Sequence, residues 1–272
     1  LMSRVVKIIL CVFGFFVVVG AFLYADFVNF CNHSVPVFAY HRITTNKDIY
    51  SMPPETFEAQ IKYLYDKGYK SISLNEFVKK REMGPEAFNK NFVITFDDGY
   101  CDNNRVAMPI MKKYGYTGTI FIAIKYMAWP GYVTWQDVLS LHENGWEIGS
   151  HTYNHVALAK STPDELEAEL KNSKDFLNKF DSRFNVNTLA YPFGSYNDDV
   201  YSALAKNGYI AAATGIDGVN TTETPVYQLY RVNIFNDGKD VKMFAKRLLW
   251  AQLSSWTRSH GVDITSARRF LQ

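Results

Sequence analysis

Residues 91–100 read NFVITFDDGY and place two adjacent carboxylates at the end of an apolar run. The run at 93–96 is typical of a short, continuous apolar strand. Gly99 predicts a turn, so Asp97 and Asp98 come where that strand leaves the core. Adjacent acids before a glycine also fit an ordinary turn, in which an Asp side chain bonds to the local backbone. The other strands of the chain have to decide between a turn and a functional site.

Strand and helix patterns alternate on both sides of this stretch. Short apolar runs predict strands, and amphipathic patterns with caps and glycine stops predict helices between them. The predicted strands span residues 35–41, 70–74, 91–96, 117–124, 146–151, 188–192, 209–214 and 230–235. The predicted helices span residues 53–68, 75–81, 104–115, 134–145, 162–180, 198–208 and a terminal segment from about Lys239. Because this alternation is typical of parallel sheets, the sequence predicts one α/β domain, most economically a barrel.

The composition is that of a globular protein without a strong electrostatic field. Of the 272 residues, 47% are hydrophobic and 21% are charged, which allows an ordinary core. Lys and Arg total 29 against 27 Asp and Glu, so we expect no nucleic-acid partner. We also expect a monomer. Beyond the N-terminal segment, Cys31 and Cys101 allow one disulfide at most, and neither is expected to be catalytic.

The N-terminal segment predicts a membrane span. Residues 8–24 contain no charge, and about 20 apolar residues are enough to cross a bilayer. Arg4 and Lys7 precede the run and Asp26 follows it, so the positive-inside rule places the N-terminus in the cytoplasm. A cleaved signal peptide is the alternative, but its apolar region is usually shorter, and Leu23 makes a poor cleavage site. We therefore expect a single-pass anchor with the remaining chain outside, or a secreted protein if the segment is cleaved.

Reactive side chains stand at the C-terminal ends of four predicted strands, which is where α/β barrels carry their chemistry. His41 closes the first predicted strand, and the acid pair Asp97 and Asp98 follows the predicted strand at 91–96. His151 closes a third strand, and the tetrapeptide YPFG at 191–194 closes a fourth.

The spacing of His151 and His155 favours a metal site. On one helical turn, side chains four residues apart project in the same direction and can share a divalent ion. Asp98 would complete a set of two histidines and one carboxylate, which suits Zn²⁺ or another first-row metal better than Ca²⁺. Asp97 is then left as a neighbouring base. The adjacent carboxylates thus predict one ligand and one proton acceptor.

The motifs TFDDG, HTYNH and YPFG, in this order, resemble those of the NodB-homology polysaccharide deacetylases, the family-4 carbohydrate esterases. The resemblance covers about residues 35–235. It implies a distorted (β/α) barrel, here preceded by one transmembrane helix, and a metal held by Asp98, His151 and His155. It also implies Asp97 as catalytic base and the removal of N-acetyl or O-acetyl groups from a glycan. The expected metal is Zn²⁺, with Co²⁺ and Ni²⁺ as alternatives.

Two departures from the family pattern point to a subgroup. Ala190 stands where the third motif usually has the Arg that orients the base, and the usual C-terminal Leu-x-His segment has no clear match. A histidine near the start, His41 in FAYHRI, makes the chain similar to the biofilm poly-N-acetylglucosamine deacetylases, whose motif order is permuted. By that resemblance His41 is the general acid, and the alternative is a strand-end histidine bonded to the backbone. Arg231 or Arg42 could replace the missing Arg.

Further residues are expected to contact substrate. A backbone N–H near Phe193 would stabilise the oxyanion together with the metal. Aromatic rings could form sugar-stacking walls, although ordinary packing explains each of them equally well. The expected contacts are Tyr191, Pro192, Phe193, Gly194, Tyr153 and Trp135, with Trp129 and Tyr132 as further wall residues.

The sequence thus favours a membrane-anchored, metal-dependent enzyme that removes N-acetyl groups from an N-acetylglucosamine polysaccharide outside the cytoplasm. Residues 1–30 would be the anchor or signal segment, and residues 31–272 the catalytic domain with a C-terminal helical tail. Biofilm exopolysaccharide is the favoured substrate. Deacetylation of peptidoglycan or another glycan, an inactive glycan-binding domain, and a different metal-dependent amidohydrolase are the alternatives.

Overall fold

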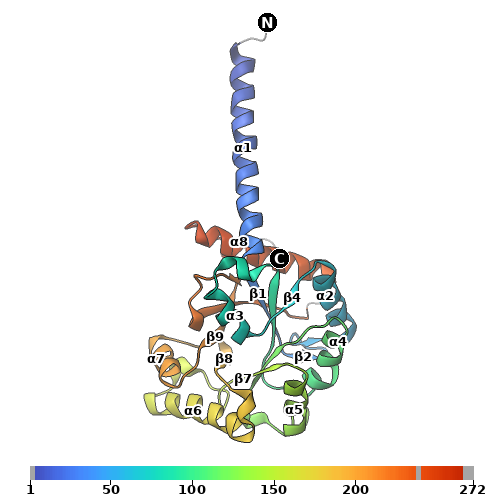
Figure 1. Cartoon of the computed structure of the whole chain (residues 1–272), viewed down its shortest axis with the longest axis vertical. Coiled ribbons are helices and arrows are strands. Elements are labelled where there is room, and N and C mark those ends of the chain that lie inside the picture. The colour runs from blue at the N-terminus through green and yellow to red at the C-terminus, as the bar shows by residue number, and fades with distance from the viewer. Residues whose placement is uncertain (1–3, 237–239, 266–272) are drawn as a thin grey trace.

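Seven parallel strands close into a barrel in the computed structural model, which describes residues 4–236 and 240–265 (Figure 1). Around the barrel, each strand pairs with its neighbours in the order β1, β11, β9, β8, β7, β6, β5 and back to β1. The strands are β1 (Val35–Tyr40), β5 (Asn91–Phe96), β6 (Thr119–Ile122), β7 (Glu147–Ser150), β8 (Thr188–Ala190), β9 (Ala211–Asp217) and β11 (Leu229–Asn233). The predicted α/β barrel is confirmed, and all seven C-terminal strand ends open toward one side.

Helices surround the barrel, two short strands pair with barrel strands, and two more form a separate pair. The helices are α1 (Arg4–Asn32), α2 (Pro54–Asp66), α3 (Leu74–Arg81), α4 (Met108–Lys112), α5 (Trp135–Glu143), α6 (Pro163–Phe180), α7 (Asp198–Lys206) and α8 (Val241–Ser259). The short strands are β4 (Lys70–Ser71) beside β5, β10 (Val219–Asn220) antiparallel to β1, and the pair β2 (Arg42–Ile43) and β3 (Ser51–Met52). Cys31 and Cys101 are both unpaired.

Local sequence explains where the elements begin. The predicted strand at 70–74 is cut short because Ser73 starts α3 with a capping box, its hydroxyl accepting from the Glu76 N–H. The same device, with Thr162 and Glu165, begins α6 at the predicted place. The terminal helix begins at Val241; Lys239, where we expected its start, lies outside the described residues.

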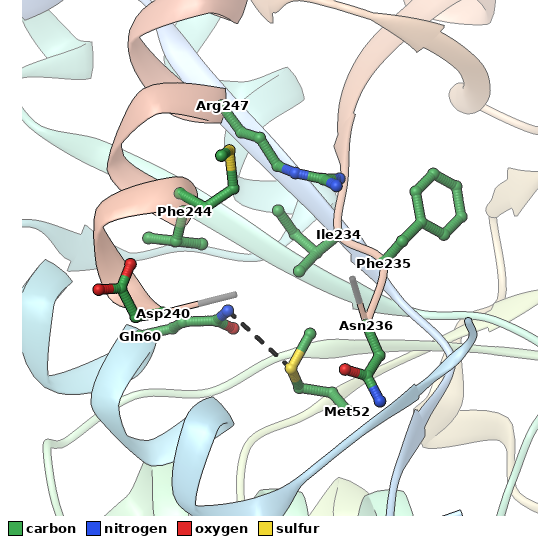
Figure 2. A pocket seen from close by; sticks show the side chains of 9 residues that line it. Met52, Gln60, Ile234, Phe235, Asn236, Asp240, Phe244 and Arg247 are labelled. Atoms are coloured by element: carbon green, nitrogen blue, oxygen red, sulfur yellow. Dashed lines mark hydrogen bonds between the residues drawn. The ribbon is translucent and has the colours of Figure 1, made fainter. Parts of the chain in front are cut away.

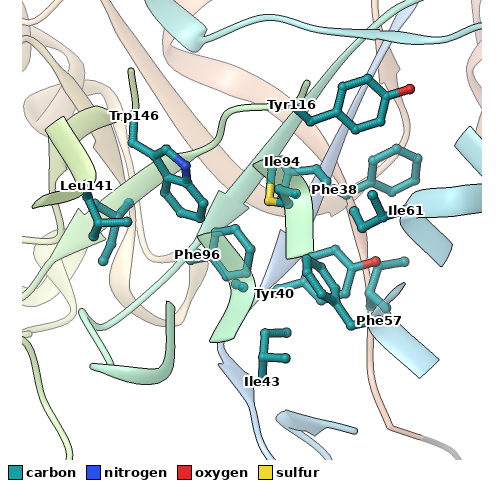
Figure 3. Close-up of a cluster of buried hydrophobic side chains, with 14 of the residues drawn as sticks. Phe38, Tyr40, Ile43, Phe57, Ile61, Ile94, Phe96, Tyr116, Leu141 and Trp146 are labelled. Atoms are coloured by element: carbon teal, nitrogen blue, oxygen red, sulfur yellow. The ribbon is translucent and has the colours of Figure 1, made fainter. Parts of the chain in front are cut away.

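An aromatic cluster packs α2 against the barrel and fixes the strands that carry the candidate site (Figure 3). Tyr40 of β1 stacks on Phe96 of β5 with ring centroids 5.8 Å apart, and Phe96 stacks on Trp146 at 5.1 Å. Phe57 of α2 meets Tyr40 edge-on at 5.2 Å. Since such pairs stabilise a core beyond simple area burial, they hold the ends of β1 and β5 in register.

α8 closes a small pocket beside the segment that follows β11 (Figure 2). In it, the Gln60 amide approaches the Met52 sulfur at 4.0 Å, and Arg247 donates to the Asn233 carbonyl at 2.8 Å. The nine lining residues include none of the predicted site residues, so this pocket supports the fold and is not the candidate site.

The helix α1 projects from the barrel and is anchored to it at its base (Figure 1). Among the described residues it is the one helix long and apolar enough to cross a membrane. Near its end, Asp26 accepts a hydrogen bond from the Trp256 indole at 2.7 Å, and Phe27 packs edge-on against Trp256. The helix continues past the expected boundary at residue 30 and ends at Asn32.

Candidate active site

Three predicted ligands meet at the mouth of the barrel. Asp98 follows β5, His151 follows β7, and His155 lies four residues further on. The Asp98 Oδ1 atom is 3.4 Å from His151 Nε2 and 3.3 Å from His155 Nε2. One ligand atom from each residue lies within 4.8 Å of the other two. The structure therefore brings together the set that the sequence predicted.

The donor atoms of this set fit a cation. The buried His151 ring places Nδ1 2.8 Å from the Ala190 carbonyl, which makes Nδ1 the protonated nitrogen and leaves the Nε2 lone pair facing Asp98. A lone pair that faces a carboxylate needs a proton or a metal between them. Burial acts to raise the pKa of Asp98, but where protons fill these positions, hydrogen bonds from the two histidines outweigh burial and lower that pKa. Two imidazoles and one carboxylate match a first-row divalent metal.

The loop that carries the histidines is not helical, contrary to the geometry assumed for their spacing. Thr152 and His155 both have positive φ, at 67° and 57°. The Thr152 N–H donates to Ser150 Oγ at 3.1 Å, and the His155 N–H donates to Thr152 Oγ1 at 3.0 Å. The two histidines converge because this tight turn reverses the backbone, and not because they share a helical face.

Asp97 is buried beside the ligands and is held by an arginine. The Arg231 Nη1 atom lies 2.8 Å from Asp97 Oδ1, and Arg231 Nε donates to the Thr214 carbonyl at 2.7 Å. Burial acts to raise the pKa of Asp97, but the charges of Arg231, His151 and His41 and the hydrogen bond from Arg231 together outweigh burial and lower that pKa. Asp97 is therefore a carboxylate at neutral pH, with a fixed orientation.

Arg42, the other candidate for this contact, points elsewhere. Its Nε lies 3.3 Å from Asp102 Oδ2, and its guanidinium sits 4.7 Å from the centre of the Tyr100 ring. The expectation that Arg42 could orient the base is thus corrected, because Asp102 engages it.

His41 lies at the end of β1, and its imidazole is not bonded to the backbone within the described part of the chain. Its Nδ1 is buried without a hydrogen-bond partner there, and its ring packs 4.7 Å from the Tyr50 ring. Burial lowers the pKa of His41, although the charges of Asp97 and Asp98 oppose this effect. A buried, unpaired imidazole nitrogen is unusual and is typical of a functional group.

The YPFG segment forms a tight turn, and its second half faces the site. Phe193 has a φ of 58°, its side chain is 75% exposed, and its ring lies 4.8 Å from the His155 ring. Phe193 is the second residue of a 3₁₀ turn, and its N–H has no acceptor among the described residues. Gly194 also has a positive φ, of 62°, which favours glycine at this position. The free N–H is the kind of group that can stabilise an oxyanion.

Tyr191 and Pro192 support this turn from behind. Both side chains are buried, and the Tyr191 hydroxyl donates to the Tyr227 carbonyl at 2.9 Å. The Tyr191 N–H donates to the Ala213 carbonyl. The expected substrate contact through Tyr191 is corrected, because both of its donors are used in packing the barrel.

Two expected sugar-stacking residues also belong to packing. Trp135 stacks on Phe180 with ring centroids 3.7 Å apart, between α5 and α6. The Tyr153 ring meets Phe176 of the same helix at 6.0 Å. No described contact joins Trp135 or the Tyr153 ring to the three ligands.

A different aromatic group borders the ligands, and sequence reasoning missed part of it. Tyr126 lies 5.7 Å from the His155 ring and contacts both Trp129 and Tyr132, while Tyr132 stacks on Tyr100. Trp129 is 52% exposed. Tyr126 follows the end of β6 by four residues, so its place after a strand end is the sequence signal that points to it.

Comparisons with known proteins agree on one family. The polysaccharide deacetylase family model matches residues 86–212, which include the three ligands and Asp97. YxkH of Bacillus subtilis, a protein assigned to the polysaccharide deacetylases, is 33% identical over 202 residues, covering 74% of this chain and 71% of its own. The poly-β-1,6-N-acetyl-D-glucosamine N-deacetylase of Staphylococcus epidermidis is 30% identical over 203 residues, 69% of each chain. The Streptococcus pyogenes deacetylase PplD, solved in complex with acetate, superposes with a TM-score of 0.71 and 26% identity, over 79% of this chain and 98% of that one.

Proposed function

This chain belongs to the polysaccharide deacetylase family, and we propose that it hydrolyses N-acetyl groups of an N-acetylglucosamine polysaccharide outside the cytoplasm. The observation that supports this proposal most strongly is that two neighbouring acids have different partners. Asp98 faces two histidines while Asp97 faces Arg231. Family enzymes are metal-dependent, and this arrangement offers one metal site and one base. Relatives in Staphylococcus epidermidis and Staphylococcus aureus that are named for poly-β-1,6-N-acetyl-D-glucosamine favour that polymer as substrate.

Asp98, His151 and His155 would hold the ion, with Zn²⁺ expected and Co²⁺ or Ni²⁺ as alternatives. When bound, a divalent ion supplies Lewis acidity that polarises the acetyl carbonyl and the attacking water. The Ala190 carbonyl fixes the His151 tautomer, so that Nε2 keeps the lone pair needed for coordination.

Asp97 is the base in this proposal. It accepts the proton of the attacking water, and Arg231 keeps it ionised and oriented for that transfer. The Phe193 N–H then donates to the oxyanion of the tetrahedral intermediate.

His41 is the proposed acid. Its lowered pKa makes the protonated imidazole a strong proton donor, which suits the poor leaving amine. One proton passes from the water to Asp97 and one from His41 to the amine, so each turnover leaves Asp97 protonated and His41 neutral. Proton exchange with solvent then returns both residues to their starting states.

The exposed rings at the mouth favour a glycan over a small amide. Trp129 and Phe193 are both exposed. The Phe193 ring contacts the His155 ring directly, and Trp129 contacts Tyr126, whose ring lies against that of His155. Aromatic faces of this kind stack on the apolar faces of sugar rings. A small amide would leave them without a partner.

The anchor and the domain limits are part of the proposal. Residues 1–30 form a single-pass anchor with a cytoplasmic N-terminus, and residues 31–272 form the catalytic domain outside, which acts as a monomer. Cleavage of the segment would instead release a secreted enzyme.

Acetate release tests the proposal. The purified chain, supplied in turn with Zn²⁺, Co²⁺ and Ni²⁺, is assayed on β-1,6-linked N-acetylglucosamine oligomers, peptidoglycan fragments and O-acetylated glycans. We expect the fastest release from the β-1,6 oligomers. Faster release from another polymer would change the substrate, and glycan binding without any acetate would indicate an inactive binding domain.

A further inference from the structure

A buried carboxylate lies behind the loop that carries the two histidine ligands. Glu169 of α6 is 6% exposed, and its Oε2 accepts from the Tyr153 N–H at 2.9 Å and the Asn154 N–H at 2.8 Å. Its Oε1 accepts from the Asn154 side-chain amide at 2.6 Å. One carboxylate therefore binds both residues at the centre of the loop.

The position of Glu169 on its helix is unusual for an acid. The buried face of α6 consists otherwise of Leu166, Leu170, Ser173 and Leu177. A charged residue on such a face is costly unless it is fully hydrogen-bonded. The three bonds from the loop supply that compensation, so the acid and the loop depend on each other.

We propose that Glu169 is a positioning residue for the metal site, which holds the loop in the shape that turns both imidazoles toward Asp98. The inference rests on the proposed function, since it assigns a role toward the same metal. Thr152 and His155 have positive φ, a conformation that persists only where the surroundings impose it. Ser150 and Thr152 bond the two ends of the loop through their hydroxyls, and the Lys125 N–H donates to the Tyr153 carbonyl at 2.8 Å. Among the described residues, Glu169 is the side chain from another element that bonds the two amides at the middle of the loop.

Three variants separate positioning from general stability. Glu169→Ala removes the acceptor oxygens of all three bonds. Glu169→Gln keeps the shape and one neutral acceptor oxygen, but its NH2 cannot accept from the remaining donor. Leu170→Ala is the matched control, because it opens a cavity at the next position of the same helix and removes none of the hydrogen bonds between Glu169 and the loop. The readouts are the Zn²⁺ dissociation constant by chelator competition, hydrogen exchange at the Tyr153 and Asn154 amides in metal-free protein, and Tm.

We expect Glu169→Ala to weaken Zn²⁺ binding by about 10–100-fold, the range for losing a partner behind a metal ligand. The two loop amides should exchange faster, and Glu169→Gln should lie between Glu169→Ala and wild type. Leu170→Ala should lower Tm while leaving Zn²⁺ binding and loop exchange unchanged. If Glu169→Ala does not fold, the Zn²⁺ dissociation constant and the loop exchange rates of Glu169→Gln decide the question.

Wild-type Zn²⁺ affinity and wild-type loop exchange in the Glu169 variants would overturn the inference. Equal weakening by Leu170→Ala would overturn it too, because stability would then explain the effect. Failure of the wild-type protein to bind metal would instead reject the proposed function. Hydrogen exchange in metal-free protein would still show whether Glu169 holds the loop, so the two failures can be told apart.

Discussion

At the scale of single residues, Asp97 and Asp98 are neighbours in sequence that face different partners. Asp98 has a φ of 72°, which turns the chain so that its carboxylate meets the histidines. Asp97, still at the strand end, points to Arg231 inside the barrel. The backbone turn at Asp98 separates two acids that would otherwise repel each other in one site.

Removing a ligand should separate the two roles. Loss of a residue that only supports a metal ligand costs about 10–100-fold in metal affinity. His155→Ala should lose more than this, since it removes one of three protein ligands. Asp97→Asn should keep the metal and lose about 10²–10⁴-fold in turnover. Metal analysis beside acetate release checks both, and full metal occupancy in His155→Ala would contradict the site.

The pairing of Asp97 with Arg231 predicts a change in pH dependence. The charge of Arg231 lowers the pKa of Asp97, so Arg231→Gln should raise that pKa and move the acid limb of kcat/KM to higher pH. Arg42→Gln is the control, because Arg42 pairs with Asp102. A pH–rate profile that shifts equally in both variants would show that Arg231 has no specific effect on the base.

His41 can be tested by changing the leaving group. His41→Ala should retain metal and fold but lose most activity on an acetamide, whose amine leaves poorly without a proton. It should lose much less on an activated aryl acetate, whose phenolate leaves unaided. Equal losses on both substrates would assign His41 a structural or binding role.

At the scale of elements, a second buried acid joins two strands and a helix. Glu147, the first residue of β7, accepts from the Thr188 hydroxyl of β8 at 2.5 Å and from the Asn75 N–H of α3 at 2.8 Å. Burial raises the pKa of Glu147 above its ordinary 4.5, although these hydrogen bonds oppose the shift. The folded state thus favours the protonated acid.

This shift has a definite sign for stability. Because the folded pKa is raised, the contribution of Glu147 is fully present below about pH 4.5 and is lost as the pH rises through the folded value. Glu147→Gln stays neutral and can keep both contacts, so its stability should fall less over that range. Urea unfolding of metal-free protein from pH 4 to about pH 8 measures the difference. Parallel curves for wild type and variant would contradict the prediction.

At the scale of the whole molecule, the apolar helix α1 and the candidate site lie at opposite ends of β1. α1 ends at Asn32, three residues before β1 begins, and His41 follows the last residue of that strand. Six strand residues span about 20 Å. The mouth of the barrel is therefore at the end remote from the base of α1 (Figure 1).

Fractionation tests the anchor. We expect the full-length chain in the membrane fraction, with its barrel cleaved by protease added from outside. A variant that lacks residues 8–24 should be soluble and should still release acetate from short oligomers. A shortened, soluble form of the unmodified chain would favour a cleaved signal segment.

The sequence by itself determined the barrel and the set of residues at its mouth. Strand and helix periodicity is local, and parallel strands align their C-terminal ends, so Asp98 and His151 had to lie on the same side once the strands were assigned. The motifs also carried the family, which the comparisons confirm. Even the loop at 151–155 was found by its spacing, although its backbone is a tight turn and not a helix.

Only the tertiary structure decided which side chains support that set. Arg231 and Asp97 are 134 residues apart, and no local pattern distinguishes Arg231 from Arg42. Whether Trp135 faces a sugar or Phe180 depends on how α5 and α6 pack, and Glu169 looks like any surface acid until its helix is docked. Periodicity fixes the end of a strand from a few residues, whereas these contacts join distant segments whose approach is set by packing of the whole barrel.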